Sequence, residues 1–170
     1  MKVSRSIFRA YDIRGVVGKD LSNQSIYLIG LALGEILNQR QVHICGLGRD
    51  MRDSSLEFSR IFKSALQEKN IAVKDFGEVP TPVLYFGACS QEGQTGVMIT
   101  GSHNPPEYNG LKIMIKSLPF WGDDIQLLYK RIVSGDFYFK TMKAMKNRDN
   151  TPIVDCYKNA VMAKQNLSRH

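Results

Sequence analysis

The sequence predicts an α/β fold: a three-layer sandwich with a small mixed, mostly parallel sheet between helices. Short apolar segments typical of buried strands alternate with longer segments whose apolar residues recur at helical spacing. Such alternation is typical of a sheet whose strands are connected by helices packed on both faces. The 170 residues, of which 43% are hydrophobic, suffice for one domain with a buried core.

The first part of the chain contains two predicted strand–helix pairs. Residues 7–12 form a short strand candidate, and Ser22 can cap a helix that runs to about residue 40. Residues 42–47 are typical of a buried strand, after which Asp53 or Ser54 can cap a second helix. The apolar residues of this second helix, which we expect to face inward, are Leu56, Ile61, Phe62, Ala65 and Leu66.

The middle of the chain continues the alternation. Residues 71–76 are predicted to form a strand, and Pro80 and Pro82 open a third helix that ends near Cys89. Two further strands are predicted over residues 95–99 and 111–115. Because these two are close in sequence, they can pair antiparallel, which makes the sheet mixed.

The C-terminal part predicts a domain boundary. After a helix that starts at Asp123 or Asp124, residues 149–152 have the composition of a linker. The helix predicted beyond them begins another unit. We therefore expect one domain over residues 1–147, followed over residues 148–170 by a linker and the truncated start of a second domain.

Composition narrows the classes of partner. No apolar run approaches the ~20 residues that a membrane helix needs, and the N-terminus lacks the apolar core of a signal peptide. Three scattered cysteines without C-x-x-C spacing indicate neither a zinc site nor a disulfide framework, which favours the cytoplasm. Most of the net charge of +7 lies after residue 139, where seven basic residues face two acidic ones. Nucleic-acid-binding domains usually carry basic residues on the folded body, so we expect neither a nucleic-acid nor a membrane partner.

The most informative stretch is TGSHNPP at residues 100–106, between two predicted strands. It presents the hydroxyl of Ser102 on a short, stiff loop beside the imidazole of His103. Gly101 lacks a Cβ and would let a ligand approach the backbone, while two prolines prevent continuation as helix or central strand. The loop predicts a phosphoryl-carrying or nucleophilic serine, or else an ordinary polar turn, since turns contain the same residue types.

Several basic residues follow the ends of predicted elements and can gather near Ser102. These residues are Arg14, Arg49, Arg52 and Lys112. Because ligands bind where the ends of parallel strands meet, the four together favour an anion site suited to phosphate, although each alone can be a surface cation. The chain contains no complete dinucleotide fingerprint, no P-loop and no G-x-S-x-G hydrolase motif.

Three strings, FRAYDIRGVVG, GRDMRDSS and GVMITGSHNPPEYNGLKIM, resemble the first domain of the α-D-phosphohexomutases, the phosphomannomutase/phosphoglucomutase group in particular. The resemblance covers about residues 7–135. It implies an isomerase of carbohydrate metabolism that interconverts hexose 6-phosphate and hexose 1-phosphate of mannose and/or glucose, through a phosphoserine and a bisphosphorylated sugar. The implied partners are hexose monophosphates and hexose 1,6-bisphosphate, and the implied cofactor is Mg²⁺. Arg49 and Asp50 fall in a family motif that we expect to serve mainly loop structure.

The resemblance also implies roles for single residues. Ser102 matches the phosphoserine that donates its phosphoryl group to the sugar, and its phosphate would supply an oxygen ligand to Mg²⁺. His103 matches a histidine that hydrogen-bonds the reacting oxygens. Lys112 matches a lysine for general acid/base work or charge stabilisation. Arg14 matches an arginine near the transferring phosphoryl group, and Tyr11 matches a residue that lines the same substrate cleft.

The strings that the family places in later domains are missing. They are the Asp-Gly-Asp-x-Asp-Arg metal loop, the Gly-Glu-x-Ser-Gly-His sugar loop and the loop for the non-reacting phosphate. We therefore expect the isolated chain to lack mutase turnover and to need domains II–IV of the same protein. Two hypotheses stay open: the phosphoserine domain of an incomplete enzyme, and a naturally short module that binds phosphate or phosphosugars without chemistry. An open reading frame downstream of His170 favours the first, and a stop codon favours the second.

Overall fold

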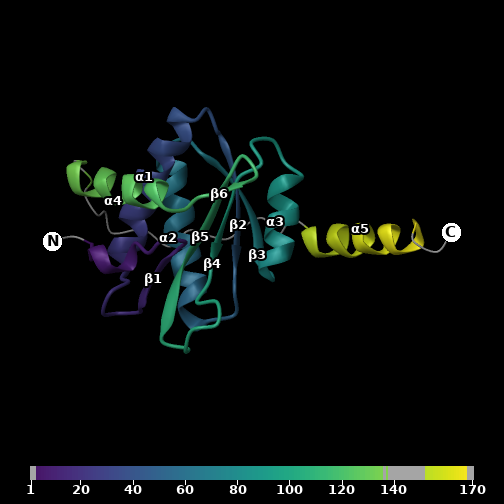
Figure 1. Ribbon diagram of the computed structural model, residues 1–170, viewed down its shortest axis with the longest axis horizontal. Coiled ribbons are helices and arrows are strands. Elements are labelled where there is room, and N and C mark those ends of the chain that lie inside the picture. Colours follow the sequence, from purple (N-terminus) through teal and green to yellow (C-terminus); the bar gives the residue numbers. More distant parts are fainter. Residues whose placement is uncertain (1–2, 136, 138–151, 168–170) are drawn as a thin grey trace.

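The computed structural model describes residues 3–135, 137 and 152–167, and it confirms the three-layer α/β arrangement (Figure 1). The sheet has the strand order β1-β5-β4-β2-β3, with β6 beside β5. Its strands are β1 (Ile13–Val16), β2 (Ile44–Arg49), β3 (Ala72–Glu78), β4 (Gly96–Ile99), β5 (Tyr108–Ile115) and β6 (Leu118–Pro119).

The sheet is mixed because one strand opposes all the others. Strand β2 pairs in parallel with β3 and β4, whereas β5 pairs antiparallel with β1, β4 and β6. All strands except β5 therefore run in the same direction. The short connection between β4 and β5 produces this antiparallel pair, as the spacing in the sequence predicts.

Helices cover both faces of the sheet. On one face α1 (Asn23–Gln39) packs against α2 (Asp53–Glu68) and α4 (Asp123–Ser134). On the other face α3 (Thr81–Cys89) packs on β2 and β4, and α5 (Ile153–Leu167) packs on α3 and projects from the body (Figure 1). The larger hydrophobic core lies under α1, α2 and α4, and a smaller one lies beneath α3.

Most predicted helix starts are confirmed. Ser22 caps α1: its hydroxyl accepts from the Ser25 N–H at 3.2 Å, and the Ser25 hydroxyl accepts from the Ser22 N–H at 2.8 Å. Pro80 is the N-cap residue of α3. Helix α2 starts at Asp53, but its N-cap is Arg52, and no side chain caps it.

Several predictions from the sequence were wrong in detail, among them the start of β5, which lies at Tyr108 rather than at residue 111. Residues 7–12 do not form the first strand: Phe8 bridges to Ile13 across a turn, so the strand begins only at Ile13. Strand β2 begins two residues later than predicted. Leu56 is 37% exposed, because the inward position near the start of α2 belongs to the fully buried Ser55. The predicted boundary between residues 147 and 148 lies outside the described residues.

Candidate functional site

The loop that carries Ser102 connects β4 to β5 at the carboxyl end of β4. Ser102 has a φ of 53°, in the left-handed region that residues other than glycine seldom adopt. Its N–H donates to Thr100 Oγ1 at 2.8 Å, and its side chain is partly exposed. Strained backbone of this kind is enriched at functional sites, where surrounding contacts must hold it.

Arg52 supplies many of those contacts from the β2–α2 connection. Its Nη1 donates to the carbonyl oxygens of Pro105 at 2.6 Å and Tyr108 at 3.0 Å. Its Nη2 donates to those of Asn104 at 2.7 Å and Ser102 at 3.1 Å. The guanidinium is therefore bound to the loop itself, and Arg52 is not the free cation that the anion-site hypothesis requires.

Asp50 also holds this loop, together with Arg52. Its carboxylate accepts from the Gly101 N–H at 3.0 Å, from the Ser55 hydroxyl, and from the N–H and Nε of Arg52 at 3.2 Å each. Burial raises the pKa of Asp50, but hydrogen bonds from Ser55, Thr100 and the backbone N–H groups of Arg52 and Gly101 outweigh it. The net result is a pKa below the usual value of 3.8.

Gly101 lies against Arg52, whose guanidinium occupies the space beside its Cα. The expectation that this glycine leaves room for a ligand was therefore wrong. The side chain of Arg52 fills that space. The sequence gives no indication of this contact, because the two residues are 49 positions apart.

Arg14 reaches the base of the loop from β1. It is 2% exposed, its Nη1 donates to the Thr100 carbonyl at 3.0 Å, and its Nη2 pairs with Asp12 at 2.6 Å. Its buried Nε has no hydrogen-bond partner among the described residues. The structure thus hydrogen-bonds the buried guanidinium of Arg14 to Thr100, which lies two residues before Ser102 in the sequence.

Lys112 and Arg14 lie on the same face of the sheet, on adjacent strands. Arg14 pairs with Gly110 in the β1–β5 ladder, and Lys112 is two residues further along β5. Lys112 also lies opposite Met98 on β4, a residue of the smaller core. Within the described part of the chain, the ammonium group of Lys112 has no hydrogen bond or ion pair.

His103 and Tyr11 lie apart from these contacts. His103 is exposed at the loop tip. Tyr11 is 75% exposed and stacks on Trp121, with ring centroids 5.9 Å apart. Tyr11 lies just before the start of β1, whereas the residue of β1 that pairs with the start of β5 beside the serine loop is Val16, at the other end of the strand. The described contacts therefore link Tyr11 to Trp121 rather than to Ser102.

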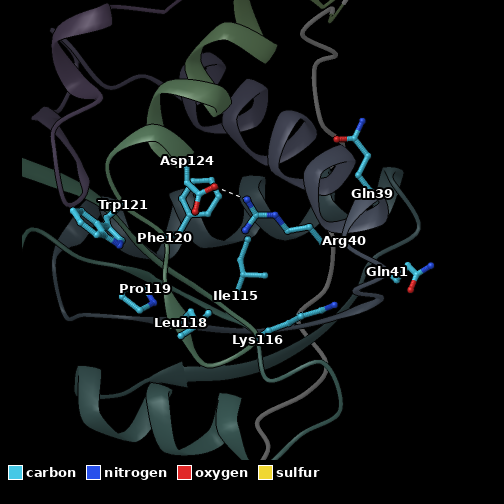
Figure 2. A pocket seen from close by; sticks show the side chains of 10 residues that line it. All are labelled: Gln39, Arg40, Gln41, Ile115, Lys116, Leu118, Pro119, Phe120, Trp121 and Asp124. Carbon is cyan, nitrogen blue, oxygen red and sulfur yellow. Dashed lines mark hydrogen bonds and ion pairs between the residues drawn. The ribbon is translucent and has the colours of Figure 1, made fainter.

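A cavity of about 580 Å³ lies at the other end of β5 (Figure 2). Its lining includes Lys116, Phe120 and Trp121, and Arg40, which donates to Asp124 across it. The ion pair between Arg40 and Asp124 leaves Lys116 as the other charged side chain among the residues that line this cavity. The cavity lies at the opposite end of β5 from the Ser102 loop, and Trp121 in its lining stacks on Tyr11.

The described residues do not by themselves hold a divalent metal. No three His, Cys, Asp or Glu side chains among them are grouped for coordination. The carboxylate of Asp50, which accepts from the N–H of Gly101 beside Ser102, is already occupied by hydrogen-bond donors. The described residues therefore do not supply a complete ligand set for Mg²⁺, and the hydroxyl of Ser102, once phosphorylated, is the group of the candidate site that could contribute an oxygen ligand. Among the described helices, none has the length and apolar character to cross a membrane.

Comparison with known proteins matches most of the chain to one family. Residues 5–139 match the family described as phosphoglucomutase/phosphomannomutase, alpha/beta/alpha domain I. The chain is 47% identical over 131 residues to a phosphomannomutase/phosphoglucomutase of Pseudomonas aeruginosa, covering 77% of this chain and 28% of that protein. It is 43% identical over 135 residues to a phosphoglucomutase of Neisseria meningitidis, covering 79% and 29%.

A solved structure shows the same fold. The phosphoglucomutase/phosphomannomutase family protein of Burkholderia thailandensis superposes with a TM-score of 0.73 at 41% identity, covering 77% of this chain and 30% of that one. The chain thus spans under a third of the length of these relatives. The matched segment, the sheet topology and the serine loop together place the chain in the phosphohexomutase family, as its N-terminal domain I.

Proposed function

We propose that this chain is the phosphoserine domain of a mutase that interconverts hexose 6-phosphate and hexose 1-phosphate, of mannose and/or glucose, through a bisphosphorylated sugar. The observation that carries the proposal is the hydrogen bond from Arg14 to the Thr100 carbonyl. It supports a shared site for a buried cation and the Ser102 loop. Relatives named phosphomannomutase and phosphoglucomutase support the reaction class.

In the proposed reaction the bond between Ser102 Oγ and phosphorus breaks as a sugar hydroxyl oxygen bonds to phosphorus. The reverse transfer, from the other phosphate of the bisphosphorylated sugar, regenerates the phosphoserine. Phosphoryl transfer spreads negative charge over three oxygens, so positioned cations supply much of the catalysis. Arg14 and Lys112 would supply that charge from one face of the sheet, Lys112 also serving as the proton acceptor or donor. His103 would hydrogen-bond the reacting oxygens, and Tyr11 would bind substrate in the complete protein.

The rest of the protein would provide what this chain does not. We assign residues 1–147 to domain I and residues 148–170 to a linker and the start of domain II. Mg²⁺ would be held by the Ser102 phosphate and by ligands outside this chain, where it would neutralise charge on the phosphate. The isolated 170 residues are expected to be inactive, and the complete enzyme is expected in the cytoplasm.

The test uses the product of the complete reading frame that contains this sequence. After incubation with glucose 1,6-bisphosphate, its intact mass should rise by ~80 Da, the mass of one phosphate on serine. Ser102→Ala should abolish both this increase and mutase turnover, whereas Ser6→Ala, which alters an exposed serine, should change neither. Binding of phosphosugar without phosphorylation or turnover would replace the proposal with a non-catalytic binding module.

A further inference from the structure

We infer that Asp50 and Arg52 act as a pair of positioning residues that fix the backbone of Ser102 in the pose from which its hydroxyl reacts. This inference rests on the proposed function of Ser102. It assigns the β2–α2 connection a part in the reaction without contact between its side chains and substrate. Arg52 would therefore act through the loop, unlike Arg14 and Lys112.

The hydrogen bonds of Arg52 account for its whole donor capacity. A guanidinium has five N–H donors in a fixed planar fork. Both terminal nitrogens donate to two loop carbonyls each, and Nε donates to Asp50. The side chain is 16% exposed, so these bonds form largely away from water. A lysine has three donors on a single atom and cannot reproduce this pattern.

The pair contacts the chain on both sides of the Ser102 side chain. Asp50 accepts from the N–H of Gly101, the residue before it, and Arg52 donates to the carbonyl of Ser102 itself. The remaining backbone polar group, the Ser102 N–H, donates to Thr100 Oγ1. Neither polar group of the Ser102 backbone can therefore turn without breaking a hydrogen bond.

Such fixation matters because the observed backbone is strained and the proposed reaction is directional. A serine with a φ of 53° relaxes to negative φ unless its neighbours prevent it. Phosphoryl transfer requires the attacking and leaving oxygens to be roughly in line with phosphorus. Loss of Arg52 should let the loop relax, and an error of about 1 Å in such a geometry reduces the rate about 100-fold.

The experiment compares Arg52→Ala and Arg52→Lys with Arg60→Ala. Arg60 is an exposed arginine of α2, the helix that follows Arg52, and it has no hydrogen bond or ion pair in the described part of the chain. Its replacement removes the same positive charge without removing a contact to the loop. In the 170-residue chain, carbon and amide NMR shifts report whether Ser102 keeps its left-handed backbone. In the product of the complete reading frame, steady-state kinetics separate kcat from KM.

We expect both Arg52 variants to lose the left-handed shifts of Ser102, and kcat to fall about 100-fold with little change in KM. Arg60→Ala should change neither. Guanidinium ion, added to Arg52→Ala far below denaturing concentrations, should restore the shifts and part of kcat, whereas ammonium ion should not.

Three results bear on the inference in different ways. Retention of the Ser102 shifts and of kcat in Arg52→Lys overturns it, because the planar fork would then be unnecessary. Loss of folding stability in Arg52→Ala with unchanged shifts and kcat also overturns it. A wild-type protein that never becomes phosphorylated on Ser102 overturns the proposed function instead, and the NMR comparison still decides whether Arg52 holds the loop.

Discussion

The guanidinium of Arg52 occupies the space that a side chain at position 101 would need. A Cβ added to Gly101 would lie 2.1 Å from both Cζ and Nε of Arg52, well inside van der Waals contact. A glycine in the serine loop and an arginine at the start of α2 are therefore complementary. The contact joins two residues that are far apart in sequence within one loop conformation.

Gly101→Ala should displace the guanidinium and break part of its hydrogen bonding to the loop. We expect a loss of about 1–3 kcal/mol in the free energy of unfolding, measured by denaturant titration, as for other overpacked sites. In an Arg52→Ala background the same substitution should be less damaging. A coupling free energy between the two sites near zero in this double-mutant cycle would contradict the contact.

Asp50 should make stability depend on pH in acid. Its pKa is lowered in the folded protein, so its contribution to stability is present above the usual value of 3.8 and is lost as the pH falls through the lower folded value. Asp50→Asn should lower Tm at pH 7, and the difference from wild type should shrink toward pH 2–3. A difference in Tm that stays constant over this range would show that the charge of Asp50 does not contribute.

The three cysteines should differ in reactivity. Burial raises the pKa of the Cys45 thiol to about 12, so the reactive thiolate is scarce at pH 8. Cys89 and Cys156 are exposed. Iodoacetamide should alkylate these two in the native protein and Cys45 only after unfolding, as peptide mass spectrometry can show. Rapid native alkylation of Cys45 would contradict the packing of β2.

Substitutions of Arg14 and of Lys112 should differ in their effect on the free energy of unfolding. Lys112→Met removes a partly exposed group without a partner among the described residues, so the free energy of unfolding should change by no more than about 0.5 kcal/mol. Arg14→Met removes buried hydrogen bonds to Thr100 and Asp12 and should destabilise by about 1–3 kcal/mol.

Turnover should fall in both variants, at least 100-fold for Lys112→Met if it transfers a proton. These effects are measured by urea titration and by mutase kinetics on the product of the complete reading frame. Normal turnover of Lys112→Met would remove this lysine from the proposed mechanism.

Local signals in the sequence were sufficient for much of the fold. The hydroxyl of Ser22 before an apolar repeat predicted the start of α1, and the short spacing around the serine loop predicted an antiparallel pair in the sheet. Where prediction failed, tertiary contacts decided. Ser55 takes the inward position expected for Leu56, and its hydroxyl donates to the carboxylate of Asp50.

The candidate site was predicted in part. The position of Ser102 on a loop between two strands followed from the sequence, and the register of β1 with β5 brings Arg14 toward it. The hydrogen bonding of Arg52 to the carbonyls of the serine loop was not predictable in this way. Its four carbonyl partners are defined only once the loop has folded against α2, and a basic residue after a strand suggests an anion ligand first.

The left-handed backbone at residue 102 restricts which alcohol can serve there. Threonine carries the same hydroxyl, but its branched Cβ makes a positive φ a true steric outlier. Replacement of Ser102 by threonine would keep a hydroxyl oxygen as nucleophile, but the backbone would no longer hold that oxygen in the same direction. The choice between two chemically similar amino acids at this position is therefore made by chain geometry, independently of their reactivity.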